Sequence, residues 1–197
     1  MSVFKFMNQF LVLWVALMML GTPLLAQDKE SIKVADHIFP KTIVLEGTTL
    51  TLKSGTHYRY MRMFDVLSAG IYLPEALPAK DFVKPGSKAL RLCYDRSFSA
   101  EEFSKVTVDF MTDNNPIEVV KASEKEIDAF NKLYQAVVPG DCYTLIFVKG
   151  LGLSFFKNDV KLGNPGEDQF AEAVFRIWFG PEPFSKGMRD DLLEGTL

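Results

Sequence analysis

The chain is 197 residues long, with 48% hydrophobic, 24% charged and 13% aromatic residues and a formal net charge of −3. This apolar and aromatic content excludes a disordered chain, and the length suits one domain with its own core. The mild acidity argues against a nucleic-acid partner, because a protein that binds nucleic acid carries a basic face.

The first residues have the order of a secretory signal peptide. Lys5 is the only charged residue there, the apolar run Phe10–Leu20 follows, and the small residue Ala26 stands at the expected cleavage position. The run is shorter than the ~20 residues that a transmembrane helix needs. We therefore expect residues 1–26 to be a signal peptide and residues 27–197 to form one exported domain, periplasmic or secreted. Membrane attachment is expected only if the signal stays uncleaved.

The two cysteines, Cys93 and Cys142, each lie within a strand-like run. An oxidising compartment permits a disulfide between them, and the alternative is two buried free thiols that pack as small apolar groups. The sequence favours free thiols without deciding. Neither cysteine has a histidine or another cysteine near it in the sequence, so no metal site is predicted. The acidic residues in the middle of the chain lack calcium-loop spacing and are expected on a solvated surface: Asp109, Asp113, Glu118, Glu124 and Glu126.

The front half is predicted to be antiparallel sheet. Ile43–Tyr60 is rich in Thr, Val, Leu and Tyr, and polar and apolar residues alternate at Thr49–Lys53, which is the period of a half-buried strand. A second long strand is predicted over Met61–Leu73, ending at Pro74, and a third over Ala89–Tyr94.

Two helices are predicted next, each from a capping box. Ser99 with Glu102, and Ser123 with Glu126, have the spacing at which a serine and a glutamate satisfy each other's backbone N–H groups. Each pair precedes apolar residues at helical spacing, and Pro139 ends the second helix.

The sheet is predicted to resume with strands at Cys142–Val148 and Leu153–Phe156 and a short hairpin partner at Val160–Leu162. A third helix is predicted with Asn164 as its N-cap, and a short C-terminal helix from near Ser185. This order of strands and helices predicts an α+β domain, in which helices pack on one face of a large antiparallel sheet.

Three segments together resemble the chalcone isomerase-like family, and the likeness is closest to its exported bacterial members. They are Gly55–Arg59, the strand end Ile71–Leu73 and the C-terminal Phe175–Pro183. The resemblance extends from about Gly47 to Gly195. It implies an open-faced β-sandwich, with a ligand cleft between the large sheet and its helices.

The resemblance also implies a role for Arg59. Plant members close an α,β-unsaturated ketone by adding a phenolate within the molecule, and other members bind fatty acids without catalysis. In both, an arginine near the start of the long strand contacts an oxygen of the ligand, and Arg59 matches it. A guanidinium holds a carboxylate or phenolate by two parallel hydrogen bonds. The alternative is a strand-end arginine with its head in water.

One family position is changed in a way that weakens catalysis. The family places a Thr or Tyr hydroxyl five residues before the tyrosine of the Ile-Tyr-Leu motif; Tyr72 is that tyrosine, and Leu67 stands at the hydroxyl position. We assign Arg59, Leu67 and Tyr72 to the ligand site and assign no catalytic residue. His57 is a candidate proton donor, although a strand-edge position is favoured, and no Ser/His/Asp arrangement is evident.

These observations lead to three hypotheses. The first is an exported, non-catalytic protein that binds a small apolar acid, such as a fatty acid, between sheet and helices. The second is an intramolecular lyase of the chalcone–flavanone isomerase type. The third is an envelope interaction module whose cleft is filled by bulky side chains such as Met61, Met63 and Leu67. No cofactor is expected in any of them, and the sequence does not determine the oligomeric state.

Overall fold

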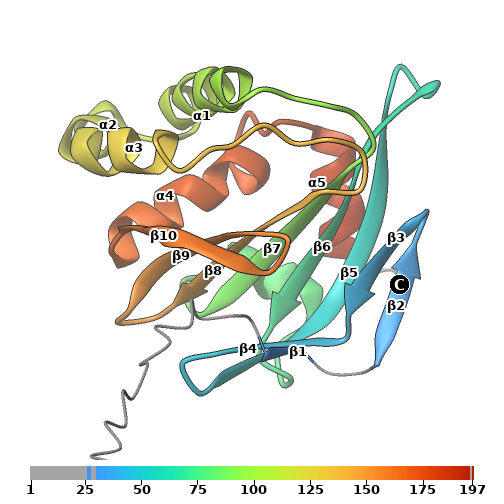
Figure 1. The fold of residues 1–197 in the computed structure, drawn as a ribbon. Helices are drawn as coiled ribbons and strands as arrows, with labels where there is room; N and C mark the ends of the chain where they lie inside the picture. Colours follow the sequence, from blue (N-terminus) through green and yellow to red (C-terminus); the bar gives the residue numbers. More distant parts are fainter. Residues whose placement is uncertain (1–25, 28–29, 196) are drawn as a thin grey trace, which may run out of the picture.

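The computed structural model describes residues 26–27, 30–195 and 197, and the predicted signal peptide lies outside them apart from Ala26. The centre is one antiparallel sheet of eight strands (Figure 1). In sheet order they are β1 (Ala26–Gln27), β4 (Thr42–Leu45), β5 (Thr48–Tyr60), β6 (Phe64–Leu73), β7 (Lys88–Tyr94), β8 (Cys142–Val148), β9 (Gly152–Lys157) and β10 (Val160–Gly166).

Helices cover one face of this sheet, and a small hairpin lies against the other (Figure 1). The helices are η1 (Ala79–Val83, a 3-10 helix), α1 (Ala100–Asn114), α2 (Ile117–Ala122), α3 (Glu124–Asn131), α4 (Asp168–Phe179) and α5 (Lys186–Glu194). The hairpin is β2 (Ser31–Val34) with β3 (His37–Pro40). None of the helices in the described part of the chain is both long and apolar enough to cross a membrane. The predicted α+β architecture, with helices on one face of a large antiparallel sheet, is confirmed.

Both faces of the central strands are buried, which explains why β6 is apolar on both sides. Leu67, Ala69 and Ile71 belong to the core on the helix side. Tyr72 belongs to the core on the side of the β2–β3 hairpin. Successive side chains of a strand point to opposite faces, so residues an even number apart share a face.

The β2–β3 hairpin lies directly on the sheet because two strand positions carry no side chain. A Cβ at Gly70 would lie 2.8 Å from Phe39 Cδ1, and one at Gly55 would lie 2.6 Å from Val34 Cγ2. Phe39 is fully buried there. The sequence pattern did not predict this hairpin, because its strands have four residues each and β3 ends in a proline.

Cys93 and Cys142 form a disulfide, which corrects the preference for free thiols. They are direct partners in the register of β7 and β8, a juxtaposition that sequence separation does not reveal. Donor atoms of His37 and the two cysteines lie within 4.8 Å of one another. The disulfide uses both sulfur atoms, so this group lacks the thiolates that bind a metal.

The first capping box is confirmed, the helix predicted after Ser123 begins there without the box, and the start predicted at Asn164 is corrected. Ser99 accepts from the backbone N–H of Glu102, whose carboxylate accepts from the backbone N–H of Ser99. Ser123 makes no side-chain cap, because it stands where α2 ends and α3 begins. Asn164 lies in β10, and its amide donates to Ser154, so α4 starts later than predicted.

Candidate functional site

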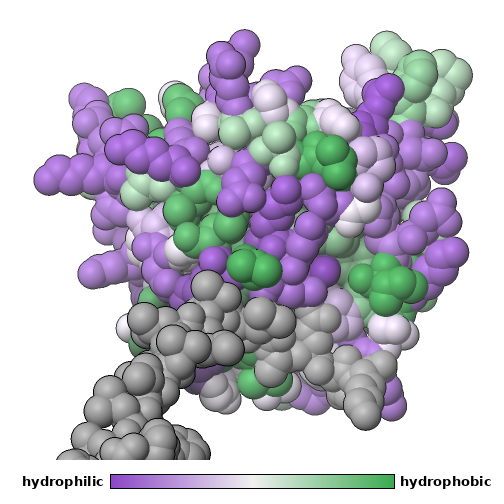
Figure 2. Space-filling model, viewed as in Figure 1, coloured by the Kyte–Doolittle hydropathy of each residue, from purple (hydrophilic) through white to green (hydrophobic). Residues whose placement is uncertain are grey.

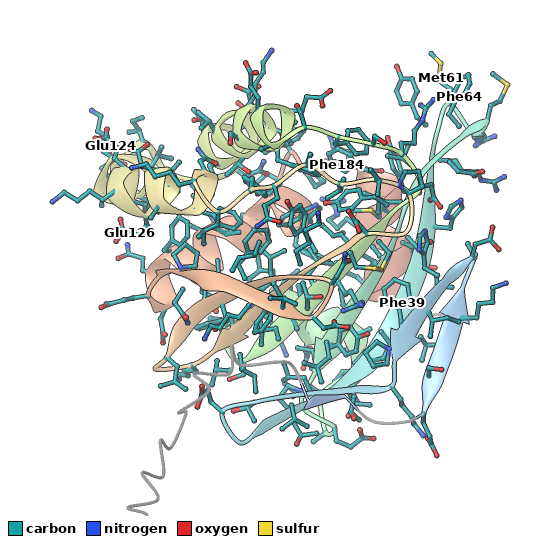
Figure 3. All side chains as sticks on the ribbon, in the orientation of Figure 1. Phe39, Met61, Phe64, Glu124, Glu126 and Phe184 are labelled. Carbon is teal, nitrogen blue, oxygen red and sulfur yellow. A yellow bond between two sulfur atoms is a disulfide. The ribbon has the colours of Figure 1, made fainter. Side chains whose placement is uncertain are left out.

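A cavity of about 100 Å³ lies between the helix-covered face of the sheet and α1 and α4. Leu67, Leu92 and Leu145 of the sheet form part of its wall. Eight aromatic side chains also line it: Tyr94, Phe98, Phe103, Tyr134, Tyr143, Phe155, Trp178 and Phe184. Figure 3 shows Phe184 between α1 and the sheet, on the opposite side of the sheet from Phe39.

The aromatic side chains hold one another in defined positions. Phe103 stacks on Tyr134 with ring centroids 5.2 Å apart and meets Tyr94 edge-on at 5.3 Å. Such pairs add stability beyond the burial of their area. Phe103 is on the first turns of α1, so the capping box at Ser99 fixes where this wall begins.

Three of the polar groups around the cavity are already hydrogen-bonded to each other or to the backbone. The hydroxyls of Thr107 and Tyr134 lie 2.8 Å apart. The Tyr143 hydroxyl donates to the Gln135 carbonyl at 2.5 Å and accepts from the Gln135 N–H at 2.8 Å. These groups have little capacity left for a ligand.

Tyr94 differs from these residues. Its hydroxyl makes no hydrogen bond within the described part of the chain, although its ring is 5% exposed and lines the cavity. Burial, with the nearby Tyr134 and Tyr143, holds the pKa of Tyr94 well above its ordinary value. The phenol therefore stays neutral and has a proton to donate to an acceptor in the cavity.

The charge at the rim is negative. Glu102 lines the cavity from α1 and is exposed, and hydrogen bonds from Ser99 hold its pKa below the ordinary value. It is therefore an anion at neutral pH. No lysine or arginine is among the described residues that line the cavity.

The three residues assigned from the sequence do not share one site. Leu67 lines the cavity and is buried. Arg59 is exposed near the end of β5, pairs with Asp65 in the strand register and is not part of the lining. Tyr72 is fully buried on the hairpin side, where its hydroxyl has no hydrogen-bond partner. The physical reason is strand parity: Tyr72 is five residues from Leu67, an odd number, and so faces the other side.

Tyr94 is the residue that the sequence pattern did not identify. It is the register partner of Leu67 across β6 and β7, and Tyr58 is the partner of Leu67 across β5 and β6. The hydroxyl that Leu67 lacks is thus present on a neighbouring strand. The sequence showed Tyr94 only as the end of a predicted strand, and the pairing became visible with the register.

The structure also brings together a Ser/His/Asp group that the sequence did not reveal. His57 Nδ1 lies 3.1 Å from Ser68 Oγ, and His57 Nε2 lies 2.8 Å from Asp65 Oδ1. Ser68 is fully buried beneath the β2–β3 hairpin, and its hydroxyl donates to the Val34 carbonyl. A nucleophile must reach its substrate, so this group is structural in the arrangement observed.

A second hollow, of about 210 Å³, lies near the turn between β8 and β9. Charged residues such as Glu46 and Lys161 line it, and its polar groups Ser154 and Asn164 are bonded to each other at 2.9 Å. The aromatic cavity is the better candidate, because ligand sites are mainly apolar with a few unpaired polar groups.

Comparisons with known proteins agree with this fold. The chain matches the family described as chalcone isomerase-like over residues 31–194. Among solved structures, the crystal structure of a fatty-acid binding protein from Arabidopsis thaliana is similar, with a TM-score of 0.60 and 16% sequence identity over 84% of this chain and 96% of that chain. At this identity the likeness shows a common fold alone. No match was found among the curated proteins.

Proposed function

The chain belongs to the chalcone isomerase-like family, and from that premise we propose that it is a non-catalytic protein that binds a small apolar acid, of the fatty-acid kind, in the aromatic cavity. The observation that carries the proposal is the hydroxyl of Tyr94, which makes no hydrogen bond within the described residues and lies in a mainly apolar cavity whose other hydroxyls are already paired. The proposed location is the periplasm or the cell exterior. The signal-like residues 1–26 and the Cys93–Cys142 disulfide support it, since disulfides persist in oxidising compartments.

The cavity favours the protonated acid over the carboxylate. The hydrocarbon part contacts aromatic side chains, and the head group accepts a hydrogen bond from Tyr94. None of the described residues that line the cavity is a cation, and the Glu102 carboxylate stands at the rim, so a bound carboxylate is poorly compensated, and burial raises the pKa of such a group. Affinity for the acid is therefore expected to rise as pH falls.

Ligand size is limited by aromatic side chains at the rim. The volume of about 100 Å³ is below that of an engineered cavity of ~150 Å³ that binds benzene. Phe98, Phe103 and Phe184 line the cavity and are only partly buried. A longer chain enters when these rings rotate outward, so affinity is expected to depend on chain length.

The first experiment compares two tyrosines that flank Leu67. Calorimetric titration with decanoic acid is made on the full chain, on Tyr94→Phe and on Tyr58→Phe. Tyr94→Phe is expected to weaken binding about fivefold, the worth of one neutral hydrogen bond. Tyr58 does not line the cavity, so Tyr58→Phe is expected to leave binding unchanged. Equal affinity in all three proteins, or no binding in any, would contradict the proposal.

The second experiment blocks the cavity from its rim. Val106 lines the cavity and is 38% exposed, whereas Val108 is 44% exposed on the same helix and does not line it. Val106→Trp is expected to abolish decanoic acid binding, and Val108→Trp to preserve it. Because both positions are partly exposed, neither substitution overfills the core.

The isomerase alternative has less support in this geometry. Its chemistry needs a cation at the attacking phenolate and a donor at the enolate oxygen. Arg59, the residue expected to supply the charge, is outside the lining, and Leu67 supplies no hydroxyl. Incubation with a chalcone tests this alternative, because ring closure removes the absorbance of the enone. The hypothesis of a filled cleft also has little support, because Met61 and Met63, the residues expected to fill it, are 68% and 72% exposed.

A further inference from the structure

The β5–β6 hairpin ends in an exposed apolar tip. Tyr60, Met61, Met63 and Phe64 are 53%, 68%, 72% and 45% exposed. Met61 and Phe64 project beyond the sheet at the upper right of the molecule (Figure 3), and the surface in Figure 2 is hydrophobic at that corner. Single exposed apolar residues are ordinary, but four within five residues of a protruding turn form a patch.

Three arginines surround this tip in a chain of net negative charge. Arg59 lies near the end of β5 and Arg62 in the turn that follows it, and both are exposed. The guanidinium of Arg96 lies 5.5 Å from the centre of the Phe64 ring. The nearest acidic residue in the hairpin, Asp65, is already bound to His57. The tip therefore combines positive charge with aromatic and methionine side chains.

The turn at the tip is strained, because two residues other than glycine have positive φ angles there. Met61 and Arg62 have φ of 50° and 60°, and the Met63 N–H donates to the Tyr60 carbonyl, so the turn has two left-handed central residues. The sequence pattern instead placed Met61 in a strand. Asn-Gly is favoured in such turns, because a Cβ at positive φ is unfavourable. Met and Arg stand where Asn and Gly would fold more easily.

From these observations we propose that the tip, defined as residues 59–64 with Arg96, docks on the surface of an anionic lipid bilayer. Aromatic and methionine side chains enter the region between head groups and acyl chains, and the arginines contact lipid phosphates. Val66 and Leu67, which line the cavity, lie in β6 just beyond Asp65, the residue that follows the tip. Docking thus brings the cavity wall close to the membrane. The proposal rests on the tip and does not require ligand binding.

The test uses a fluorescent label that reports its own position. An environment-sensitive dye is attached to the full chain at Met63→Cys or, as a control, at Ile117→Cys; the native cysteines are paired in the disulfide. Ile117 is 52% exposed at the start of α2, on the other side of the molecule. With phosphatidylglycerol vesicles, only the label at position 63 is expected to shift to the blue. If the apolar run Phe10–Leu20 alone inserted into the vesicles, the labels at positions 63 and 117 would not differ in this way.

Two variants measure what the tip contributes. Arg59→Gln is expected to weaken binding to phosphatidylglycerol vesicles about fivefold, the effect of one basic residue near an anionic surface, and Lys125→Gln on α3 is the matched control. Met61→Asn with Arg62→Gly is expected to weaken binding more than tenfold and to raise the melting temperature, because it relieves the turn. A loss of binding with a gain in stability is not attributable to misfolding.

Several results would overturn the proposal. These are an unchanged label at position 63, an equal response with pure phosphatidylcholine vesicles, or a blue shift without vesicles that depends on protein concentration. The last would show that the tip contacts a second copy of the chain. The vesicles contain no free acid, and Tyr94→Phe is expected to dock normally while Arg59→Gln is expected to bind decanoic acid normally. Failure of docking and failure of ligand binding are thus distinguishable.

Discussion

The two faces of the central sheet are buried by different means. On the hairpin side, Phe39 lies against Gly70 with no room for a Cβ, and the Cys93–Cys142 disulfide joins β7 to β8. On the helix side, aromatic rings from strands, helices and loops surround a cavity of about 100 Å³. The hairpin side is therefore held by close packing against the backbone and by a disulfide, whereas the packing on the helix side contains a cavity.

Two tyrosines illustrate the difference. Tyr72 on the hairpin side and Tyr94 on the helix side both have a hydroxyl without a hydrogen bond among the described residues, and burial raises the pKa of both. Tyr94 lines the cavity and Tyr72 does not. The same chemical group is a packing cost on one face and a donor for a ligand on the other. Changes on the hairpin side should therefore alter stability, and changes on the helix side should alter binding.

The largest effect is expected from removing the disulfide. It links residues 49 positions apart, and closing a loop of that length in the unfolded chain is worth about 4 kcal/mol. Urea unfolding of Cys93→Ala with Cys142→Ala should show a loss of that size, and so should the wild-type chain in excess dithiothreitol. The double variant should not respond to the reductant. Preserved stability after reduction would mean that packing alone supports this face.

The next effect is expected at the contact between hairpin and sheet. Phe39→Ala empties a fully buried site and should lower the free energy of unfolding by about 3 kcal/mol. Ile38, its neighbour in β3, is 56% exposed, so Ile38→Ala should change stability little. Decanoic acid binding at a temperature where both variants are folded should match the wild type. Weaker binding in Phe39→Ala would show that the two faces are coupled through the sheet.

A third prediction concerns alkaline pH. Burial raises the pKa of Tyr72, Tyr94 and Tyr134 above the ordinary 10.0. Above pH 10 the unfolded chain therefore loses protons that the folded chain keeps, so stability present below pH 10 declines as pH rises. The decline is about 1.4 kcal/mol per pH unit for each such tyrosine. Burial lowers the pKa of Lys88, so just below pH 10.5 the folded chain loses a proton that the unfolded chain keeps, and this residue makes stability rise with pH there.

Urea unfolding at several pH values tests this slope. Tyr94→Phe and Tyr72→Phe should each make the decline of stability with pH shallower by about 1.4 kcal/mol per pH unit. Tyr60→Phe should leave the slope unchanged, since Tyr60 is 53% exposed. A chain equally stable at pH 9 and pH 11 would contradict the burial of these phenols.

The sequence predicted those parts of the fold that depend on local pattern. Alternation identified β5, and the Ser99 capping box located α1, because both signals involve residues close along the chain. Ser123 has the same box spacing but makes no cap, because α2 runs into it from the N-terminal side.

The site depended on relations that span many residues. Strand parity alone separates Leu67 from Tyr72, and this could have been applied to the sequence once the strand was predicted. The neighbouring position of Tyr94 could not, because it depends on the register between β6 and β7. The exposure of Arg59 follows from the position of the turn at Met61, which the pattern had continued as a strand.

The smallest effect, and the sharpest separation of binding from stability, is expected at two helix caps. Ser99 caps α1, which carries Phe103, Val106 and Thr107 of the cavity wall, and Ser185 caps α5, which packs on β5 and η1. Loss of either cap should lower the free energy of unfolding by about 1 kcal/mol.

Ser99→Ala should also speed the release of decanoic acid in stopped-flow measurements, because the first turn of α1 frays beside the cavity. Ser185→Ala should leave the rate of release unchanged. Hydrogen bonds from Ser99 to the Glu102 carboxylate lower the pKa of Glu102, so this half of the capping box is present above pH 4.5 and weakens as pH falls below it. The bond from the Glu102 N–H to the Ser99 hydroxyl, which Ser99→Ala removes, does not depend on that carboxylate. Equal release rates in the two cap variants would show that α1 does not control access to the cavity.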